Sequence, residues 1–171
     1  MTALVKQFSH FARRSDYQIK PIELAPVVER SVEIFQSRLA ELPHIQISMN
    51  VESFEVRVQG DPLLVEQILV NLISNGIDAI ADADRKSGKI DISGRVDGEY
   101  FHIDVVDNGA GIPSLEHDIF EPFVTSKEVG KGTGLGLSIS YTIAQDLGGV
   151  LYLNNNTDQG ATASLGLRMA S

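Results

Sequence analysis

The sequence predicts an α+β fold in two layers, in which helices pack on one face of a mixed, mostly antiparallel sheet. Strand-like segments occur as three neighbouring pairs, and helical segments with apolar faces stand between them. The chain has 171 residues, of which 43% are hydrophobic and 22% charged, as expected for one compact domain with a short appendage. Such a composition supports a sizeable hydrophobic core.

Two helical segments are expected near the N-terminus. Residues 1–15 place apolar side chains at helical spacing and end in two arginines, where cations suit the helix dipole. Because no capping residue precedes this segment, we interpret it as the end of a longer helix. After a short linker or strand at 16–21, apolar residues recur at helical spacing over 22–42, and Pro43 ends this second helix.

A strand pair and a long helix follow. The stretches IQISMNV (45–51) and FEVRVQ (54–59) alternate apolar and polar residues, so they are predicted to pair with each other and to bury one face. Asp61 and Pro62 then open a helix as its N-cap and its first residue. This helix is expected to run to about residue 83 with one broad apolar face.

The second half of the chain contains two further strand pairs. KIDISGRV and YFHIDVVD are predicted to form an antiparallel pair, and GVLYLNN and ATASLGLRM a closing hairpin. Between them, residues 107–134 show little regular pattern apart from a short helix expected near 114–120, and a helix is expected over 136–147. A patternless run of this length inside a compact domain is usually a lid or a binding loop.

Four glycines fall within the seven residues 130–136, directly before that helix, and suggest a phosphate-binding turn. A P-loop is excluded, because Gly130 and Lys131 are followed by Gly132 where a serine or threonine would hold Mg²⁺. A dinucleotide-binding turn is disfavoured, because the spacing is wrong and no βαβ unit surrounds it. By themselves, the glycines are equally compatible with a plain loop at the start of a helix.

A polar stripe interrupts the helix that starts at Asp61. Asn71, Asn75 and Asp78 are spaced so that they share one side of the helix. Asparagine is unfavourable inside a helix because its amide competes for backbone hydrogen bonds, so two on one stripe suggest another role. Carboxamide oxygens suit Mg²⁺, which takes a few protein oxygens together with water and phosphate. The alternative is an ordinary solvated polar face.

Two further stretches point to a ligand. In DNGAGIP (107–113), glycines allow the backbone to approach a flat ligand, and Asp107 at a strand end can accept a hydrogen bond from an exocyclic amine such as that of adenine. The alternative is a hairpin turn at Asn-Gly. In IFEPFVTSK (119–127), two phenylalanines could anchor a mobile lid, and Lys127 or Lys131 could reach phosphate oxygens; the alternative is a packed loop.

Together, these stretches resemble the motifs of the GHKL ATP-binding domains, which have the Bergerat fold, and among them the sensor histidine kinases. NLISNGIDAI resembles the N box, DNGAGIP the G1 box, FEPF the F box and GTGLGLSIS the G2 box. The resemblance covers about Ile19 to Met169. The run IFEPFVTSKEVGKGTGLGLSIS is most similar to the branch of nitrogen-regulation and C4-dicarboxylate sensor kinases.

The resemblance implies that ATP and Mg²⁺ bind beneath a lid loop. It implies that Asn75 coordinates Mg²⁺, that Asn71 and Lys127 act in catalysis near the γ-phosphate, and that Asp107 accepts from the adenine amine. The full set of positions that it assigns to nucleotide binding is Asn75, Asp78, Asp107, Gly109, Gly111, Ile112, Phe123, Thr125, Lys127, Lys131, Gly132, Thr133, Gly134, Leu135, Gly136, Leu137 and Thr162. Gly109 and Gly111 would leave room for the adenine ring, and Thr162 would lie near Asp107.

The sequence departs from related families at three points. ATPases of the gyrase and Hsp90 kind carry a glutamate base where this chain has Asn71, and an amide cannot take a proton at neutral pH, so transfer to another nucleophile is favoured over hydrolysis. Gly76 stands where the family usually has alanine. The stretch SHFARRSD around His10 lacks the glutamate and proline that flank the phosphoacceptor histidine of histidine kinases, so the acceptor is expected to lie outside this chain.

These inferences predict the end of a dimerisation helix over 1–16 and an ATP-binding catalytic domain over 17–171. The domain would transfer the γ-phosphoryl group of ATP to a histidine on a separate dimerisation domain, which would pass it to a response regulator. A GHKL ATPase acting as a conformational switch and a non-catalytic nucleotide-sensing module are the alternatives.

Composition limits the other expectations. The net charge of −9 disfavours nucleic-acid binding, and the chain has no cysteine. No apolar run approaches the ~20 residues of a membrane span, and no signal peptide is recognised. We therefore expect a cytoplasmic domain, either free or as the cytoplasmic part of an inner-membrane sensor. Its oligomeric state stays open.

Overall fold

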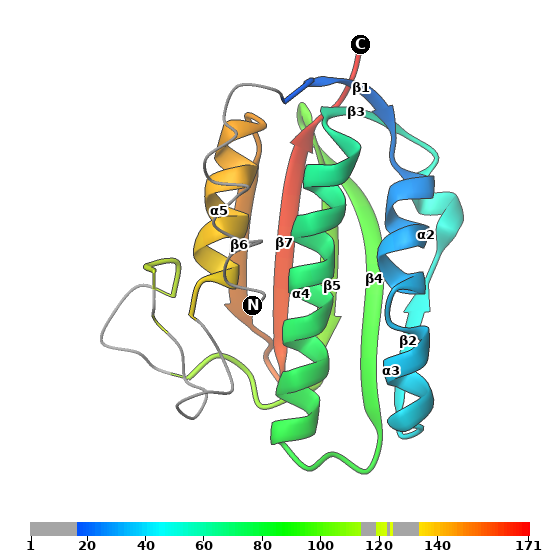
Figure 1. The fold of residues 1–171 in the computed structure, drawn as a ribbon, viewed down its shortest axis with the longest axis vertical. Helices are drawn as coiled ribbons and strands as arrows, with labels where there is room; N and C mark the ends of the chain where they lie inside the picture. Colours follow the sequence, from blue (N-terminus) through cyan, green and yellow to red (C-terminus); the bar gives the residue numbers. More distant parts are fainter. Residues whose placement is uncertain (1–16, 114–118, 123, 125–133) are drawn as a thin grey trace, which may run out of the picture.

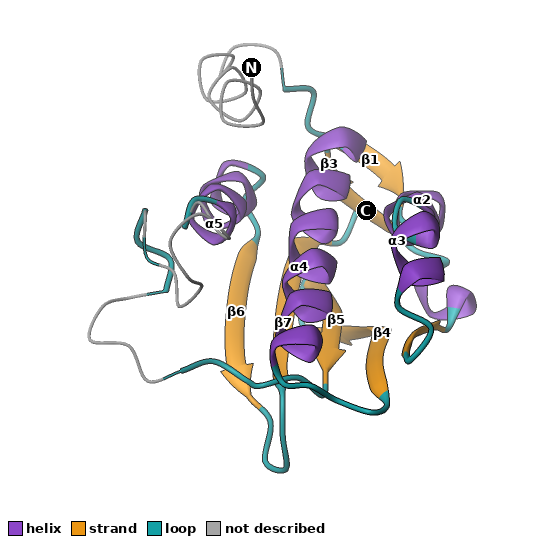
Figure 2. Ribbon diagram, turned by 60° about the horizontal axis from the view of Figure 1, so that its bottom comes forward, coloured by secondary structure: helices purple, strands orange, loops and turns teal. Residues whose placement is uncertain are grey.

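A five-stranded sheet forms one layer of the molecule, and helices cover one of its faces (Figures 1 and 2). The computed structural model describes residues 17–113, 119–122, 124 and 134–171. The strand order is β2-β4-β5-β7-β6, with β2 parallel to β4 and all other pairs antiparallel. The strands are β2 (Ile45–Met49), β4 (Gly88–Asp97), β5 (Tyr100–Asp107), β6 (Val150–Asn155) and β7 (Ala161–Arg168). The predicted fold class is therefore confirmed.

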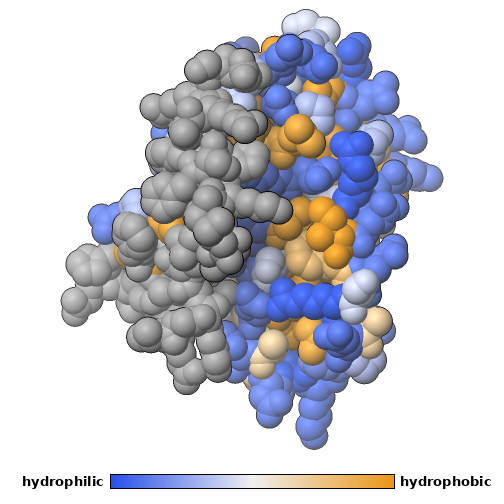
Figure 3. All heavy atoms as spheres, viewed as in Figure 1, coloured by the Kyte–Doolittle hydropathy of each residue, from blue (hydrophilic) through white to orange (hydrophobic). Residues whose placement is uncertain are grey.

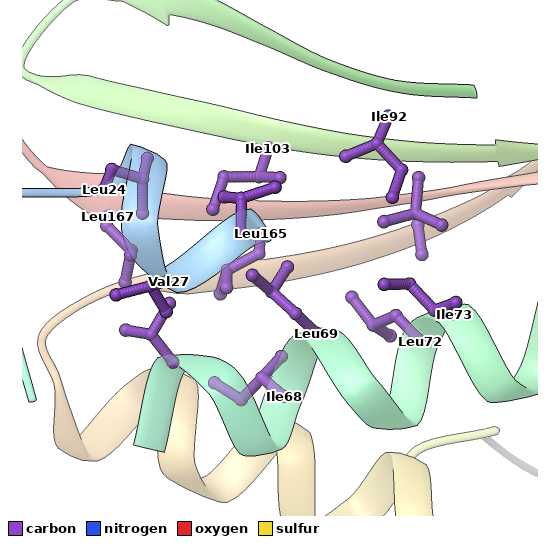
Figure 4. Packing of buried hydrophobic residues seen from close by; sticks show 14 of the residues in the cluster. Leu24, Val27, Ile68, Leu69, Leu72, Ile73, Ile92, Ile103, Leu165 and Leu167 are labelled. Carbon is purple, nitrogen blue, oxygen red and sulfur yellow. The ribbon is translucent and has the colours of Figure 1, made fainter. Parts of the chain in front are cut away.

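Helix α4 (Pro62–Asp82) lies across the middle of the sheet, and α5 (Gly136–Asp146) packs beside it. The α4 helix begins where the sequence predicts, because the Asp61 carboxylate accepts from the backbone N–H groups of Leu63 at 3.0 Å and Leu64 at 3.4 Å. Its apolar face meets the inner side chains of the sheet in a fully buried core (Figure 4). That core includes Leu69, Ile73, Ile92, Ile103 and Leu165.

In the part of the chain that the structure describes, α4 is the one helix long and apolar enough to cross a membrane by length and composition. Half of the apolar stretch of α4 is buried inside the domain. Figure 3 shows the face that carries the helices, where small groups of exposed hydrophobic side chains lie between hydrophilic ones. The apolar character of α4 is thus explained by its packing on the sheet.

The predicted single helix over 22–42 is wrong, because the chain forms one strand and two helices there. The strand β1 (Lys20–Glu23) precedes α2 (Ala25–Glu33) and α3 (Gln36–Glu41). Proline in the first turn of α2 fits a helix start, where its missing N–H has no partner to lose. Between the helices, the Phe35 N–H bonds to the Val32 carbonyl at 3.0 Å in a tighter turn, and the Phe35 side chain is buried.

The predicted pairing of 45–51 with 54–59 is also wrong. Strand β2 pairs with β4, whereas β3 (Arg57–Gly60) pairs antiparallel with β1. A 3₁₀ helix, η1 (Val51–Phe54), separates them and buries Phe54 edge-on against the Phe101 ring at 6.2 Å between ring centroids. Alternation predicts that a strand has a buried face but does not select its partner. The other two predicted pairs, β4–β5 and β6–β7, are confirmed.

Three predictions lie outside the described residues, wholly or in large part. They are the helical end over 1–16, the short helix near 114–120 and the lid loop up to residue 133.

Gly76 lies buried in the interior of α4, and a side chain can be added there. An alanine Cβ would lie 3.3 Å from the Ile90 Cδ1 atom and 3.5 Å from the Asp107 Cβ atom. Because Cδ1 ends a flexible side chain and alanine favours the helix, Gly76→Ala should raise the free energy of unfolding by about 0.5–1 kcal/mol. Chemical denaturation measures this change.

Gly109→Ala is the matched control, since its Cβ would lie 2.6 Å from the carbonyl carbon of Ala79 and should destabilise the fold. A loss of stability in Gly76→Ala would show that the Ile90 contact cannot relax.

Candidate nucleotide-binding site

A cavity of about 550 Å³ lies between α4, the inner face of β5 and β7, the loop after β5 and the start of α5. That volume is typical of a site for a small-molecule ligand. The predicted positions that line it are Asn71, Asn75, Asp78, Asp107, Gly111, Ile112, Gly134, Gly136 and Leu137. These residues come from α4, the end of β5, the loop after β5 and the start of α5, so the structure brings four separate elements together around the cavity.

The polar stripe of α4 faces this cavity, as its spacing predicts. Asn71, Asn75 and Asp78 line the cavity, while Ile73 and Ile77 on another side of the helix are fully buried. Side chains three and four residues apart share one face of a helix, which explains how one element supplies both the core and a polar wall. The amides are therefore available to a ligand instead of facing only bulk solvent.

The amide of Asn71 is held by α5. Its Nδ2 atom donates to the Oγ atom of Ser140 at 2.9 Å, and a Cβ on Gly136 would lie 2.3 Å from its Oδ1 atom. Glycine at 136 therefore allows the start of α5 to approach α4 closely. Ser140 is the last residue of the stretch GTGLGLSIS, but the predicted site residues of this helix stop at Leu137, so this contact adds to the prediction.

Asp78 forms an ion pair with Arg38 of α3. The Nη1 atom of the same guanidinium donates to the Oγ atom of Ser74 at 3.2 Å. Both Ser74 and Asp78 line the cavity, so Arg38 is attached to its wall. Arg38 belongs to no motif and lies 40 residues before Asp78 in the chain, so no sequence pattern predicts this contact.

Asp107 ends β5 and carries the predicted base-recognition carboxylate. Its Oδ1 atom accepts from the backbone N–H groups of Gly109 at 2.8 Å and Ala161 at 3.4 Å. Burial raises the pKa of Asp107, while these two hydrogen bonds lower it in part. The carboxylate is thus fixed in orientation within a partly dehydrated wall of the cavity.

The loop after β5 differs from expectation at Gly109. This residue does not line the cavity; a Cβ there would lie 2.6–2.8 Å from atoms of Ala79, so glycine is needed for packing against α4. The Ala110 N–H also donates to the Ala79 carbonyl at 3.0 Å. Gly111 does line the cavity and has φ +77°, a conformation that favours glycine.

Asn155 of β6 fixes the loop after β5 through two hydrogen bonds. Its Oδ1 atom accepts from the Ile112 N–H at 2.6 Å, and its Nδ2 atom donates to the Ile112 carbonyl at 3.0 Å. No pattern predicts this role for Asn155, although the residue lies in a run of three asparagines at 154–156.

Thr162 and Leu135 do not line the cavity. Side chains alternate along a strand, so Ala161 and Ala163 of β7 face the cavity while Thr162 points to the other face. The Thr162 hydroxyl donates to the Asn156 Oδ1 atom at 2.6 Å, and Asn156 donates to the Asp107 carbonyl at 3.1 Å. Leu135 is only 7% exposed and packs at the start of α5.

Several predicted contacts lie outside the described residues, namely Phe123, Thr125, Lys127, Lys131, Gly132 and Thr133, as does His10. Of the two phenylalanines predicted to anchor the lid, only Phe120 lies among the described residues. The Phe120 ring stacks on the Tyr141 ring of α5 at 4.7 Å between centroids and packs against the core.

Comparison with known proteins assigns a family to this arrangement. Residues 60–171 match the family described as histidine kinase-, DNA gyrase B-, and HSP90-like ATPase. The C4-dicarboxylate transport sensor protein DctB of Rhizobium meliloti (strain 1021) is 31% identical over 170 residues, which are 98% of this chain and 26% of that protein. The nitrogen regulation protein NtrY of Azorhizobium caulinodans is 33% identical over 156 residues, which are 89% of this chain and 20% of that protein.

Solved structures agree. The nucleotide-free catalytic domain of the histidine kinase ThkA superposes with a TM-score of 0.73 at 27% identity, over 89% of this chain and 96% of that domain. The same kinase in complex with the response regulator protein TrrA shares the fold, with a TM-score of 0.75 at 22% identity over 98% of this chain and 46% of that chain.

The chain thus has the fold and the cavity of an ATP-binding catalytic domain. It belongs to the family of histidine kinase-, DNA gyrase B- and HSP90-like ATPases, and within that family it is similar to sensor histidine kinases, including those of the predicted C4-dicarboxylate and nitrogen-regulation branch. It spans about a quarter or less of the length of these two curated relatives.

Asp107→Asn should weaken binding of adenine nucleotides in particular. A carboxamide accepts more weakly than a carboxylate and can turn its NH₂ group toward the adenine amine. Calorimetric titration with ATP and GTP measures the preference, which we expect to fall about tenfold or more. Asp104→Asn is the control, since Asp104 lies on the same strand but pairs with Arg95. An equal loss for ATP and GTP would show that Asp107 does not read the base.

The same carboxylate predicts a pH dependence. An ionised Asp107 accepts from the amine, and burial raises its pKa, so acidification should neutralise it at a higher pH than an ordinary aspartate, whose pKa is about 3.9. The ratio of the ATP affinity of the wild type to that of Asp107→Asn should therefore fall as the pH is lowered. Taking this ratio cancels the titration of the phosphates. A ratio independent of pH would contradict this role.

Proposed function

We propose that this domain binds Mg²⁺-ATP in the cavity and, within a longer sensor kinase, transfers the γ-phosphoryl group to a histidine of its dimerisation domain. One observation carries the proposal. In a chain of this ATPase family, the side chains of Asn71, Asn75 and Asp107 converge on a single cavity. The Asp107 side chain lies against Gly76, in the C-terminal half of α4, whereas Asn71, beside the start of α5, lies nearer the middle of the helix.

The geometry suggests how a nucleotide would lie. The base would meet Asp107, with apolar side chains such as Val105, Leu153 and Ala163 along the wall. The phosphates would extend toward the first turn of α5, whose backbone N–H groups and dipole favour an anion. ATP would therefore run along α4 from the end of β5 to the start of α5.

The residues also fit a magnesium ion. Asn75 stands one turn from Asn71 on the stripe that faces the cavity, and its amide oxygen is a hard ligand of the kind that Mg²⁺ accepts. A magnesium ion bound there would neutralise charge on the phosphates. By the family resemblance, Lys127, Lys131 and Thr133 would add phosphate contacts.

Phosphoryl transfer is favoured over hydrolysis at this site. Asn71 stands where hydrolytic relatives have a carboxylate base, and its amide is already engaged as a donor to Ser140. The chain would therefore act by positioning the nucleotide and by compensating its charge, which is how most phosphoryl transfer is catalysed. The ATPase conformational switch is the weaker alternative for the same reason.

The proposed partners are a dimerisation domain carrying the acceptor histidine and, after it, a response regulator. The histidine kinase ThkA, which shares the fold, has been solved in complex with the response regulator protein TrrA, and this supports the second partner by analogy. We place the domain in the cytoplasm, where ATP is available, either free or attached to a membrane-bound sensor.

Asn75→Ala should abolish the Mg²⁺-dependent part of ATP binding and leave the fold intact, because it removes the proposed metal ligand. Calorimetric titration with and without Mg²⁺ measures the change, and circular dichroism checks the fold. Gln67→Ala is the control, since Gln67 is a carboxamide of the same helix that does not line the cavity. Wild-type affinity in Asn75→Ala would exclude the assignment.

The isolated chain should bind ATP, turn it over more slowly than about 1 s⁻¹, and not label itself. The reason is that Asn71 cannot act as a base and no histidine of the chain stands in an acceptor motif. Incubation with γ-labelled ATP and Mg²⁺, followed through free phosphate and protein-bound label, measures both. A separate fragment carrying the acceptor histidine should gain the label. Faster turnover would favour the ATPase switch, and acid-labile label on His10 would place the acceptor in this chain.

A further inference from the structure

Arg38, a cation from outside the predicted motifs, is attached to the wall of the cavity. Helix α3 lies beside the C-terminal half of α4 (Figure 1), and Arg38 reaches across to two residues that line the cavity. Its guanidinium pairs with the Asp78 carboxylate and donates to the Ser74 hydroxyl at 3.2 Å. The side chains of Arg38 and Asp78 are 37% and 27% exposed, so the pair stands at the edge of the cavity.

The negative charge of the cavity wall suggests a role in ligand binding for the contact between Arg38 and Asp78. Among the described residues that line it are three carboxylates, Asp78, Asp82 and Asp107, and no lysine, arginine or histidine. The triphosphate of ATP is a polyanion, and like charges at short range in a partly dehydrated cavity repel more strongly than in water. The Asp78 carboxylate lies one helical turn from Asn75, where the proposed metal ion and the nearest phosphate would lie, and would oppose phosphate binding unless a cation compensates it.

We propose that Arg38 is a positioning residue of the nucleotide site, which neutralises Asp78 and holds its carboxylate to one side so that the phosphates can pass Asn75. The inference rests on the proposed function, because it concerns nucleotide binding in the same cavity. Arg38 touches neither the nucleotide nor the metal ion in this proposal, since it acts through Asp78 and Ser74. Its fork of donors suits this task, because it can engage a carboxylate and a hydroxyl together.

A purely structural role for Arg38 is the competing explanation. Partly exposed ion pairs contribute little to stability, so joining α3 to α4 gives a weak reason for the contact. The chain offers a direct comparison, since Arg30 of α2 pairs with Glu66 of α4 at 3.2 Å, with side-chain exposures of 53% and 24%. Neither Arg30 nor Glu66 lines the cavity. That pair joins an N-terminal helix to α4 in the same way without facing the ligand.

The test is a charge cycle on the whole chain. Affinities for adenosine, ADP and ATP are measured for the wild type, Arg38→Gln, Arg38→Lys, Asp78→Asn and the double variant Arg38→Gln/Asp78→Asn. Each titration is done with Mg²⁺ and with a chelator, at low and at high salt. Melting temperatures are recorded for every variant, and Arg30→Gln serves as the matched control.

Arg38→Gln should weaken ATP about three- to tenfold at low salt without Mg²⁺ and leave adenosine unchanged, because only the phosphates sense the exposed carboxylate. Arg38→Lys, which keeps the charge, should recover most of the affinity. Asp78→Asn should tighten ATP, and the double variant should return close to the wild type. Higher salt should reduce all of these differences, and Arg30→Gln should leave every affinity unchanged.

Each of the following results would overturn the inference. Equal losses for adenosine and ATP in Arg38→Gln would indicate a structural role, as would a double variant that binds as weakly as Arg38→Gln. If Arg38→Gln does not fold, unaltered ATP affinity in Asp78→Asn would still contradict charge compensation. A wild-type chain that binds no ATP would overturn the proposed function together with this inference, whereas wild-type binding without the charge pattern would overturn this inference alone.

Discussion

Helix α4 packs on the sheet through one side and borders the cavity with another, and most of the structure depends on that double contact. Its buried side meets β4 and β5 with residues such as Ile73 and Ile77, which are fully shielded from water. Burial of apolar side chains on this scale is the main favourable contribution to folding. Because the helix is fixed by the core, Asn71 and Asn75 have fixed positions in the wall of the cavity.

Close approach of backbone segments is the second constraint. The loop after β5 contacts α4 at Ala79 only because residue 109 is a glycine, and α5 reaches Asn71 only because residue 136 is a glycine. Both glycines belong to motifs that are otherwise interpreted as ligand-binding. In this chain, part of their role is to bring three separate segments together, and the cavity is the space that remains between them.

Much of the fold could be predicted from local signals. The start of α4 follows from Asp61 and Pro62, and two of three strand pairs follow from their alternation. The partner of β2 could not be predicted, because a strand pattern contains no information about which distant edge it meets. The helix predicted over 22–42 is interrupted at Phe35 because that side chain is buried in the core, and this depends on tertiary packing that a local pattern does not contain.

The candidate site shows the same division. The residues of α4 were predicted from helical spacing, and those of the loop after β5 from position at a strand end. Thr162 does not line the cavity although Ala161 and Ala163 do, because successive side chains of a strand point to opposite faces of the sheet. Arg38 and Asn155 lie outside the four boxes, and Ser140 ends the G2 box without a predicted contact; each acts through a contact between distant parts of the chain.

The way in which the chain enters the domain has a mechanical consequence. Strand β1 pairs with β3, and β3 is also held by the C-terminal end, where Val58 bridges to Met169 and the Ala170 N–H bonds to the Arg57 carbonyl at 2.9 Å. β3 ends at Gly60, and the next residue, Asp61, caps α4. A force applied to the chain before β1 would act first on the paired strands β1 and β3. From β3 it would reach the N-terminal end of α4, the helix that carries Asn71 and Asn75. Strand β1 is thus linked, through β3, to the start of a helix that forms one wall of the cavity.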